Sequence, residues 1–129
     1  MPDPIQFVSS QATGATSLPT TVETVVGSIV VPIVTPQAPT VSIEANINVT
    51  IGTAGTGVTM RIRRDSLTGS LVGNAQTYTL AAGSSQTMSI CADDVPGEES
   101  TRTYVVTVAQ VAATGSGTSN QANVYGVCH

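Results

Sequence analysis

The stretch that most constrains this chain runs from Val41 to Ile51. Over these eleven positions, apolar residues at odd numbers alternate without a break with polar residues at even numbers. A period of two residues is typical of a β-strand that has one buried face and one solvated face. We therefore expect this segment to be a long strand whose inner face begins the hydrophobic core.

The same alternation resumes from Val58 to Arg63, after a glycine-rich segment at Gly52–Gly57. Glycine adopts backbone angles that other residues resist, so the chain can reverse direction there. The pattern predicts a long antiparallel hairpin in which Ile51 pairs with Val58. A phosphate-binding loop is excluded, because the segment lacks the P-loop lysine and leads into a strand.

Five further segments carry strand signals, and glycine, proline or serine turns separate them. The first, Thr21–Val34, is apolar on both faces around Gly27, which predicts either a β-bulge at Gly27–Ser28 or a strand covered on both sides. Gln76–Ala81 and Gln86–Ala92 alternate more regularly, and the last two segments are Thr101–Val111 and Gln121–Cys128.

Composition supports an all-β fold. Valine and threonine are abundant, and no window repeats apolar residues at helical spacing over three turns. Seven or eight strands without helices predict a sandwich or a barrel. We expect a single jelly-roll β-sandwich of about eight antiparallel strands. An immunoglobulin domain is disfavoured because its signature needs a tryptophan and the chain has none.

Residues 1–20 differ in character from the rest. Pro2, Pro4 and Pro19 resist helix and central-strand pairing, while Ile5–Val8 is a short apolar patch. We predict an extended N-terminal arm over residues 1–20 and the jelly roll over residues 21–129. The arm could dock on a neighbouring subunit or a larger shell; a first strand of the chain's own sheet and disorder are the alternatives.

The strand at Thr101–Val111 is apolar on both faces, with Tyr104, Val106 and Val108 on one side and Val105, Ala109 and Val111 on the other. This pattern predicts that one face packs in the sandwich and the other against a partner chain. The core is built mainly of small aliphatic side chains, and oligomerisation is one way for such a chain to gain stability.

Charge excludes several partners. The net charge is −4, only 9% of residues are charged, and lysine is absent. A basic surface for nucleic acid and a polybasic membrane patch are therefore both missing. Signal-peptide features are absent, and the longest apolar run, Val25–Val34, is too short to cross a bilayer. We expect a protein made in a cytoplasm.

Residues for catalysis are sparse. The only histidine is His129 and the chain has no Gly-x-Ser-x-Gly elbow, so we expect no enzyme, no catalytic residues and no cofactor. Asp93, Asp94, Glu98 and Glu99 crowd one turn. A solvated acidic turn, a calcium site and a pair of glycosidase carboxylates are the alternatives, and the first is favoured.

The cysteines and arginines also leave alternatives open. Cys91 and Cys128 could be two small buried residues or a disulfide, whereas a zinc site lacks enough ligands. Arg61, Arg63 and Arg64 could make an intersubunit or capsid contact. The alternative is a cross-strand ion pair between Arg63 and Glu44, which the predicted hairpin would place diagonally. Asn48–Thr50 matches a glycosylation sequon, which matters only in a secreted protein.

The whole pattern resembles the small jelly-roll proteins of tailed-bacteriophage virions: head decoration (cement) proteins and related head or tail fibre domains. The resemblance covers residues 21–129 together with the arm, and rests on the Ile51–Val58 loop, the Tyr78–Gly83 turn and the Tyr104–Val111 strand. It also implies a trimer like those of tumour necrosis factor and C1q, with the Tyr104–Val111 strand near the threefold axis. The resemblance carries over no site residue.

The expected function is that of a structural virion protein on the virion surface: a trimeric decoration protein that binds the major capsid protein, or another virion protein, and stabilises the head. We expect no nucleic acid, membrane or small-molecule substrate as partner. The alternatives are a receptor- or carbohydrate-binding fibre or tail module and a self-assembling shell subunit.

Overall fold

The computed structural model describes residues 6–18, 21–33, 40–52, 56–95, 101–111 and 117–128. These residues form eight β-strands and no helix. In chain order the strands are β1 (Gln6–Ser17), β2 (Thr24–Pro32), β3 (Val41–Ile51), β4 (Thr56–Arg64), β5 (Leu71–Leu80), β6 (Ser85–Asp94), β7 (Thr101–Gln110) and β8 (Gly117–Cys128).

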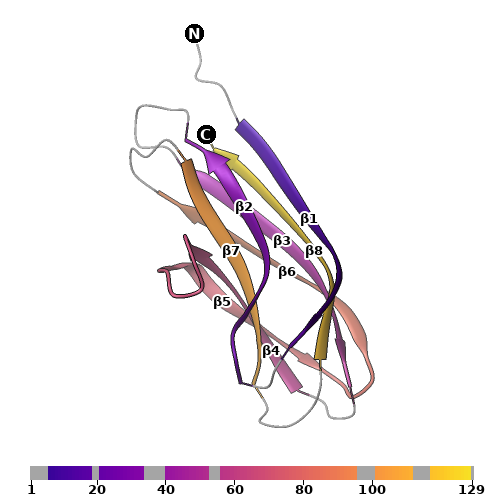
Figure 1. Cartoon of the computed structure of the whole chain (residues 1–129). Helices are drawn as coiled ribbons and strands as arrows, with labels where there is room; N and C mark the ends of the chain where they lie inside the picture. Colours follow the sequence, from indigo (N-terminus) through magenta and orange to yellow (C-terminus); the bar gives the residue numbers. More distant parts are fainter. Residues whose placement is uncertain are drawn as a thin grey trace.

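The strands form two four-stranded antiparallel sheets that pack face to face (Figure 1). Sheet A has the order β1-β8-β3-β6, and sheet B has the order β2-β7-β4-β5. Successive strands alternate between the sheets, except β4 and β5, which are neighbours in sheet B. This order is that of a jelly roll, so the predicted fold class is confirmed.

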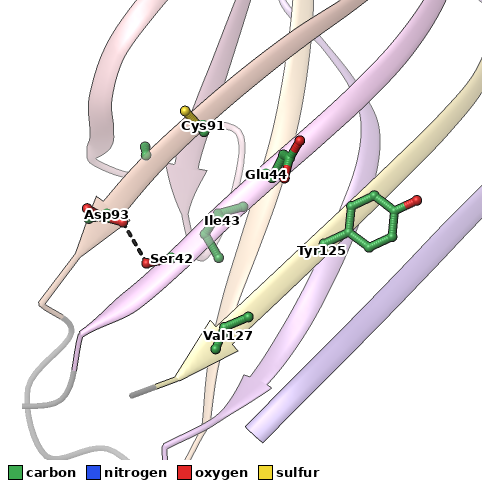
Figure 2. Close-up of a pocket in the computed structure, with 8 residues that line it drawn as sticks. Ser42, Ile43, Glu44, Cys91, Asp93, Tyr125 and Val127 are labelled. Carbon is green, nitrogen blue, oxygen red and sulfur yellow. Dashed lines mark hydrogen bonds between the residues drawn. The ribbon is translucent and has the colours of Figure 1, made fainter. Parts of the chain in front are cut away.

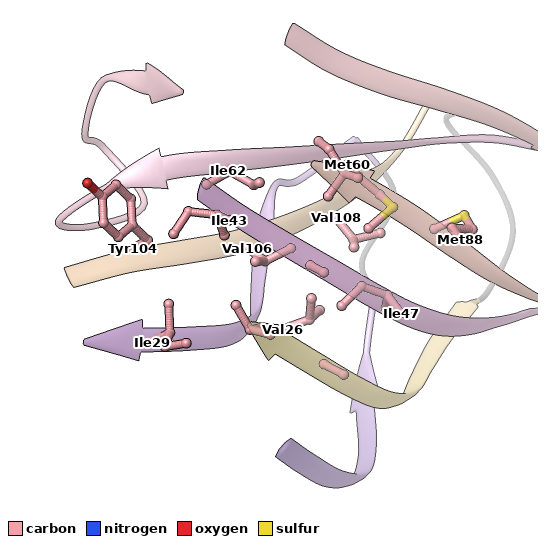
Figure 3. Packing of buried hydrophobic residues seen from close by; sticks show 14 of the residues in the cluster. Val26, Ile29, Ile43, Ile47, Met60, Ile62, Met88, Tyr104, Val106 and Val108 are labelled. Carbon is pink, nitrogen blue, oxygen red and sulfur yellow. The ribbon is translucent and has the colours of Figure 1, made fainter. Parts of the chain in front are cut away.

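The core lies between the two sheets and is filled by the residues whose alternation the sequence displays. Val41, Ile43, Ala45, Ile47, Val49 and Ile51 of β3 are all buried. Val58, Met60 and Ile62 of β4 are buried on the inner side of the opposite sheet. Figure 3 shows Met60 and Ile62 among the packed side chains. Small branched side chains of this kind pack well on pleated surfaces, and burying each one stabilises the fold by about 1.5–3 kcal/mol.

The predicted hairpin between β3 and β4 is wrong. β3 pairs with β6 and β8 in sheet A, whereas β4 pairs with β5 and β7 in sheet B. Alternation reveals that a strand has one buried face, but two strands with facing apolar sides can meet across a core as well as within a sheet. Packed sheets lie about 10 Å apart, so facing side chains from both sheets fill the space between them.

The N-terminal segment differs from the predicted arm. Gln6–Ser17 is β1, an edge strand of sheet A that pairs with β8 from Gln6 opposite Cys128 to Ser17 opposite Thr118. This is the alternative in which the segment forms a first strand of the chain's own sheet. Pro2, Pro4 and Pro19 flank this strand, so none of them removes a hydrogen-bond donor from it. Residues 1–5, 19 and 20 lie outside the described residues.

Other boundaries were predicted with mixed success. The register of β2 against β7 shifts between Val25 and Gly27, so of the two alternatives the bulge is present, just before the predicted Gly27–Ser28 position. β5 begins at Leu71 and β8 at Gly117, both inside segments that the sequence presents as glycine-containing loops. In these segments, pairing with a neighbouring strand extends the β-structure beyond what the local sequence favours.

One side of the sandwich is closed by contacts between the edge strands β5 and β6. The Tyr78 hydroxyl donates to the Ser89 carbonyl at 2.5 Å and also receives a long hydrogen bond of 3.4 Å from the Ser89 amide. β5 bulges between its pairings with Met60 and Ile62, where Gly73 has φ +68°. A Cβ added at Gly73 would lie 2.7 Å from the Cβ of Ala92.

We expect Gly73→Ala to lower the free energy of unfolding by about 2 kcal/mol, because the left-handed backbone and the contact with Ala92 both oppose a side chain. Gly83→Ala is the matched control: Gly83 also has a positive φ, +73°, but nothing lies within 4 Å of the added Cβ. Urea unfolding of both variants would separate backbone strain from the clash, and equal losses would show that Ala92 does not constrain this position.

Candidate interaction surfaces

A buried polar cluster closes one end of the sandwich. Asp94 at the end of β6 is only 8% exposed and receives two hydrogen bonds from the guanidinium of Arg64, at the end of β4 in the other sheet. The Tyr104 hydroxyl of β7 donates to Asp94 Oδ2 at 2.7 Å. The cluster thus joins β6 of sheet A to β4 and β7 of sheet B, and it satisfies a carboxylate that would otherwise be costly to bury.

A second ion-pair cluster lies on the outer face of sheet B. Glu23, just before β2, binds Arg63 of β4 in a bidentate pair, with Arg63 Nε 2.6 Å from Oε1 and Nη2 3.0 Å from Oε2. The Thr107 hydroxyl of β7 donates to the same carboxylate. Arg63 Nη1 also donates to the Gly69 carbonyl at 3.0 Å, which ties the β4–β5 loop to this face.

Both clusters alter proton affinities. Burial by itself would raise the pKa of Asp94, but the hydrogen bonds from Arg64 and Tyr104 outweigh it and lower that pKa below its ordinary value. Burial by itself would also raise the pKa of Glu23. The hydrogen bonds from Arg63 and Thr107 outweigh the effect of burial, so the pKa of Glu23 is lowered. Burial and the Asp94 carboxylate raise the pKa of Tyr104.

These directions predict loss of stability in acid. A carboxyl whose pKa is lower in the folded state stabilises the fold fully above its unfolded pKa of about 4, and this contribution disappears as the pH falls through the folded value. We expect the free energy of unfolding, measured in urea, to decrease from about pH 5 downward. Asp94→Asn and Glu23→Gln should each flatten this decrease.

Glu44→Gln is the control for this experiment, because Glu44 forms no ion pair with a described residue. If Glu44→Gln flattened the acid dependence as much as Asp94→Asn did, the two clusters would not be its source.

The outer face of sheet B also carries apolar side chains. Val25 and Val30 of β2 are 39% and 55% exposed, and they pair with outward-facing positions of β7. Val105 and Thr107 on the outer face of β7 are already buried by the chain itself. The sequence predicted that a partner chain covers this face; Val105 and Thr107 are instead buried within one chain, while Val111 at the end of the same face is 61% exposed.

An open groove of about 510 Å³ lies on the outer face of sheet A (Figure 2). Its walls are two rows of side chains that cross three strands. Tyr125, Glu44 and Cys91 form one row, and Val127, Ser42 and Asp93 form the next. The Ser42 hydroxyl donates to Asp93 Oδ1 at 2.7 Å. No local sequence pattern indicates this groove, because strands distant in the chain supply its sides.

The predicted acidic turn divides into two parts. Asp94 points into the sandwich end and Asp93 lies in the outer groove, while Glu98 and Glu99 lie outside the described residues. Among the described residues, no group of three or more histidine, cysteine, aspartate or glutamate side chains could hold a metal ion. The calcium alternative therefore has no support from Asp93 and Asp94 alone.

The cysteines occupy opposite faces of sheet A. Cys128 is buried in the core, as expected for a small apolar residue, whereas Cys91 is exposed in the groove, so its predicted burial is wrong. Both are free thiols, and the disulfide alternative is not formed. Cys91 alternates with Met88 and Ile90 and so shares the polar face of β6 with Thr87 and Ser89, which is the exposed face.

Arg63 forms an ion pair, as predicted, but its partner is not the predicted Glu44. Arg63 pairs with Glu23 rather than with Glu44, because β3 and β4 lie in different sheets. Arg64 pairs with Asp94 and Arg102 with Asp65. Glu23 comes from a segment forty residues before Arg63 in the sequence, so no local spacing rule could have identified it.

Comparisons with known proteins establish the fold and not a family. No protein-family model matches the chain, and no curated protein matches it in sequence. Among solved structures it is similar to the VP2 subviral particle of infectious bursal disease virus, with a TM-score of 0.58, 10% identity, and coverage of 98% of this chain and 33% of that one. A structure of the Gx strain of that virus is similar with a TM-score of 0.57 and 13% identity, and the match covers 98% of this chain and 32% of that one.

The C-terminal domain of EclA, described as a sugar-binding protein, is also similar, with a TM-score of 0.50, 10% identity, and coverage of 88% of this chain and 78% of that one. The chain spans about a third of the length of the viral chains that it matches. It therefore has a β-sandwich fold that a viral capsid protein and a sugar-binding domain also use. Among the described residues, no helix has the length and hydropathy to span a bilayer.

Proposed function

We propose that this chain is a structural virion protein: a trimeric decoration protein that binds the exterior of a bacteriophage head and stabilises it. The observation that carries the proposal is the outer face of sheet B, where Val25 and Val30 stand exposed beside the buried Val105. An apolar sheet face of this kind suits contact with another copy of the chain. The fold shared with a viral capsid protein is compatible with this role.

Stabilisation of the head would follow from mass action. A protein that binds only the assembled shell lowers the shell's free energy by RT ln(1 + [L]/Kd), where [L] is the free protein concentration. The decoration protein needs no chemistry of its own for this effect. The stability of its fold and the affinity of its docking surface for the shell determine how much the shell is stabilised.

The proposed trimer is tested by sedimentation velocity of the purified protein at micromolar concentration. We expect a species of three chains, and we expect Val30→Asp to dissociate it because a carboxylate would be buried in the interface. Val95→Asp is the matched control, since Val95 is 62% exposed at the end of β6 and away from this face. A monomeric wild-type protein would remove the trimer from the proposal.

Binding to heads is tested by mixing the protein with phage heads that lack it, followed by electron cryomicroscopy and thermal unfolding of the heads. We expect added density on the outer surface and a higher disruption temperature. Retention on a glycan array, without any density on heads, would instead support the alternative of a carbohydrate-binding module.

A further inference from the structure

Positive charge is confined to one of the two sheets. The chain has no lysine, and its four arginines are on sheet B strands: Arg61, Arg63 and Arg64 on β4 and Arg102 on β7; its one histidine, His129, lies outside the described residues. The strands of sheet A carry Glu44, Asp93 and Asp94 and no basic residue. Because Asp94 points into the sandwich end, Glu44 and Asp93 set the charge of the outer face of sheet A.

These two carboxylates flank the groove, and no described residue forms a counterion for either of them. Three arginines are engaged elsewhere, by Glu23, Asp94 and Asp65, and neither Glu44 nor Asp93 forms an ion pair with a described residue. Both are exposed. The groove therefore presents unneutralised negative charge beside the Tyr125 ring and Val127 (Figure 2).

The spacing of the carboxylates fits an extended polypeptide. Glu44 pairs directly with Cys91, so Asp93 is its diagonal neighbour on the same face, at a distance of roughly 7–8 Å for such pairs. Alternate side chains of an extended strand repeat every 6.4–6.8 Å or so, which is close to this spacing. Tyr125 adds an aromatic face for a cation, and Val127 an apolar surface for an aliphatic stem.

We propose that this groove docks an extended basic segment of a partner protein, with arginine or lysine at alternate positions. The inference rests on the proposed function for the partner's identity: the segment would belong to the head. The residues outside the described part of the chain include Asp3, Glu98 and Glu99, whose negative charge the groove would repel. A metal ion is a poorer occupant, because the two carboxylates are too far apart to share one.

Cys91 offers a local readout of occupancy, because its thiol is exposed in the groove while Cys128, the other cysteine, is buried. The experiment measures the rate at which N-ethylmaleimide alkylates Cys91, with intact mass and peptide mapping as the readout. The rate is compared with and without an eight-residue peptide of alternating arginine and threonine. We expect the peptide to slow alkylation several-fold at saturation. Raising the salt from 20 to 500 mM should remove the protection, since the ion pairs are exposed.

Charge specificity is tested with a matched peptide of alternating glutamate and threonine, and with variants of the protein. The acidic peptide should give no protection. Glu44→Gln and Asp93→Asn together should weaken binding of the basic peptide roughly five- to tenfold, because each exposed ion pair changes an affinity by a factor of up to about five. Asp65→Asn, an exposed carboxylate beside sheet B, should leave the binding unchanged.

Three results would overturn the inference: no protection by the basic peptide, equal protection by both peptides, or equal binding by the wild type and the double variant. The same variants, mixed with heads, separate this inference from the proposed function. If the wild type binds heads and the double variant binds them equally well, the groove is not the docking site and the proposed function stands. If heads are not bound but the basic peptide protects Cys91 in a charge-dependent way, the proposed function fails and the groove remains a site for basic segments.

Discussion

Replacing Ile47 with alanine is expected to lower the free energy of unfolding by about 3 kcal/mol. Ile47 is fully buried in the middle of β3, where it pairs with Met88 on one side and Ala122 on the other. Its side chain lies between the two sheets (Figure 3), so truncation removes buried apolar area and also leaves a cavity. Urea unfolding followed by circular dichroism would measure the loss.

Val95→Ala is the control for this prediction, because Val95 is 62% exposed and its truncation should cost less than about 0.5 kcal/mol. If the two variants lost stability equally, the assignment of Ile47 to the core would be wrong. If Ile47→Ala lost almost nothing, the sheets would not pack across this position.

Replacing Asp94 with alanine is expected to cost about 3 kcal/mol. The change leaves the guanidinium of Arg64 and the buried hydroxyl of Tyr104 without their shared acceptor. Removing one partner of a buried ion pair typically costs about 3–5 kcal/mol, and the partial exposure of Arg64 places this site at the lower end. Tyr104→Phe should cost about 1 kcal/mol, because it removes only one hydrogen bond.

Urea unfolding of Asp94→Ala, Tyr104→Phe and the double variant gives the coupling between the two residues. We expect the double variant to lose less than the sum of the single losses, by at least about 0.5 kcal/mol, since both changes remove the same hydrogen bond. Strictly additive losses would show that Tyr104 and Asp94 act independently, contrary to the geometry of the cluster.

The two outer faces of the sandwich have different characters that complement each other in the proposed role. Sheet B presents exposed valines beside an internally neutralised ion pair, Glu23–Arg63, which suits contact with another copy. Sheet A presents a groove with two carboxylates that lack a counterion among the described residues, which suits a basic partner. The proposed trimer would use the first kind of contact between its own subunits and the second with the shell.

The sequence by itself determined the class of fold and the orientation of the best strands. The alternation at Val41–Ile51 identified the buried residues of β3, and the interrupted pattern around Gly27 identified the bulge in β2. Both properties are local, because the direction of a side chain in a strand depends only on its position within the strand. The same reasoning gave the eight-stranded jelly roll from strand number and spacing.

Only the tertiary structure decided which strands are neighbours. It placed β3 and β4 in opposite sheets, added Gln6–Ser17 to the edge of sheet A, and paired Arg63 with Glu23 instead of Glu44. It also assembled the groove from β3, β6 and β8. The physical reason is that an apolar face can be buried equally well by several partners, and the packing of the whole chain selects among them.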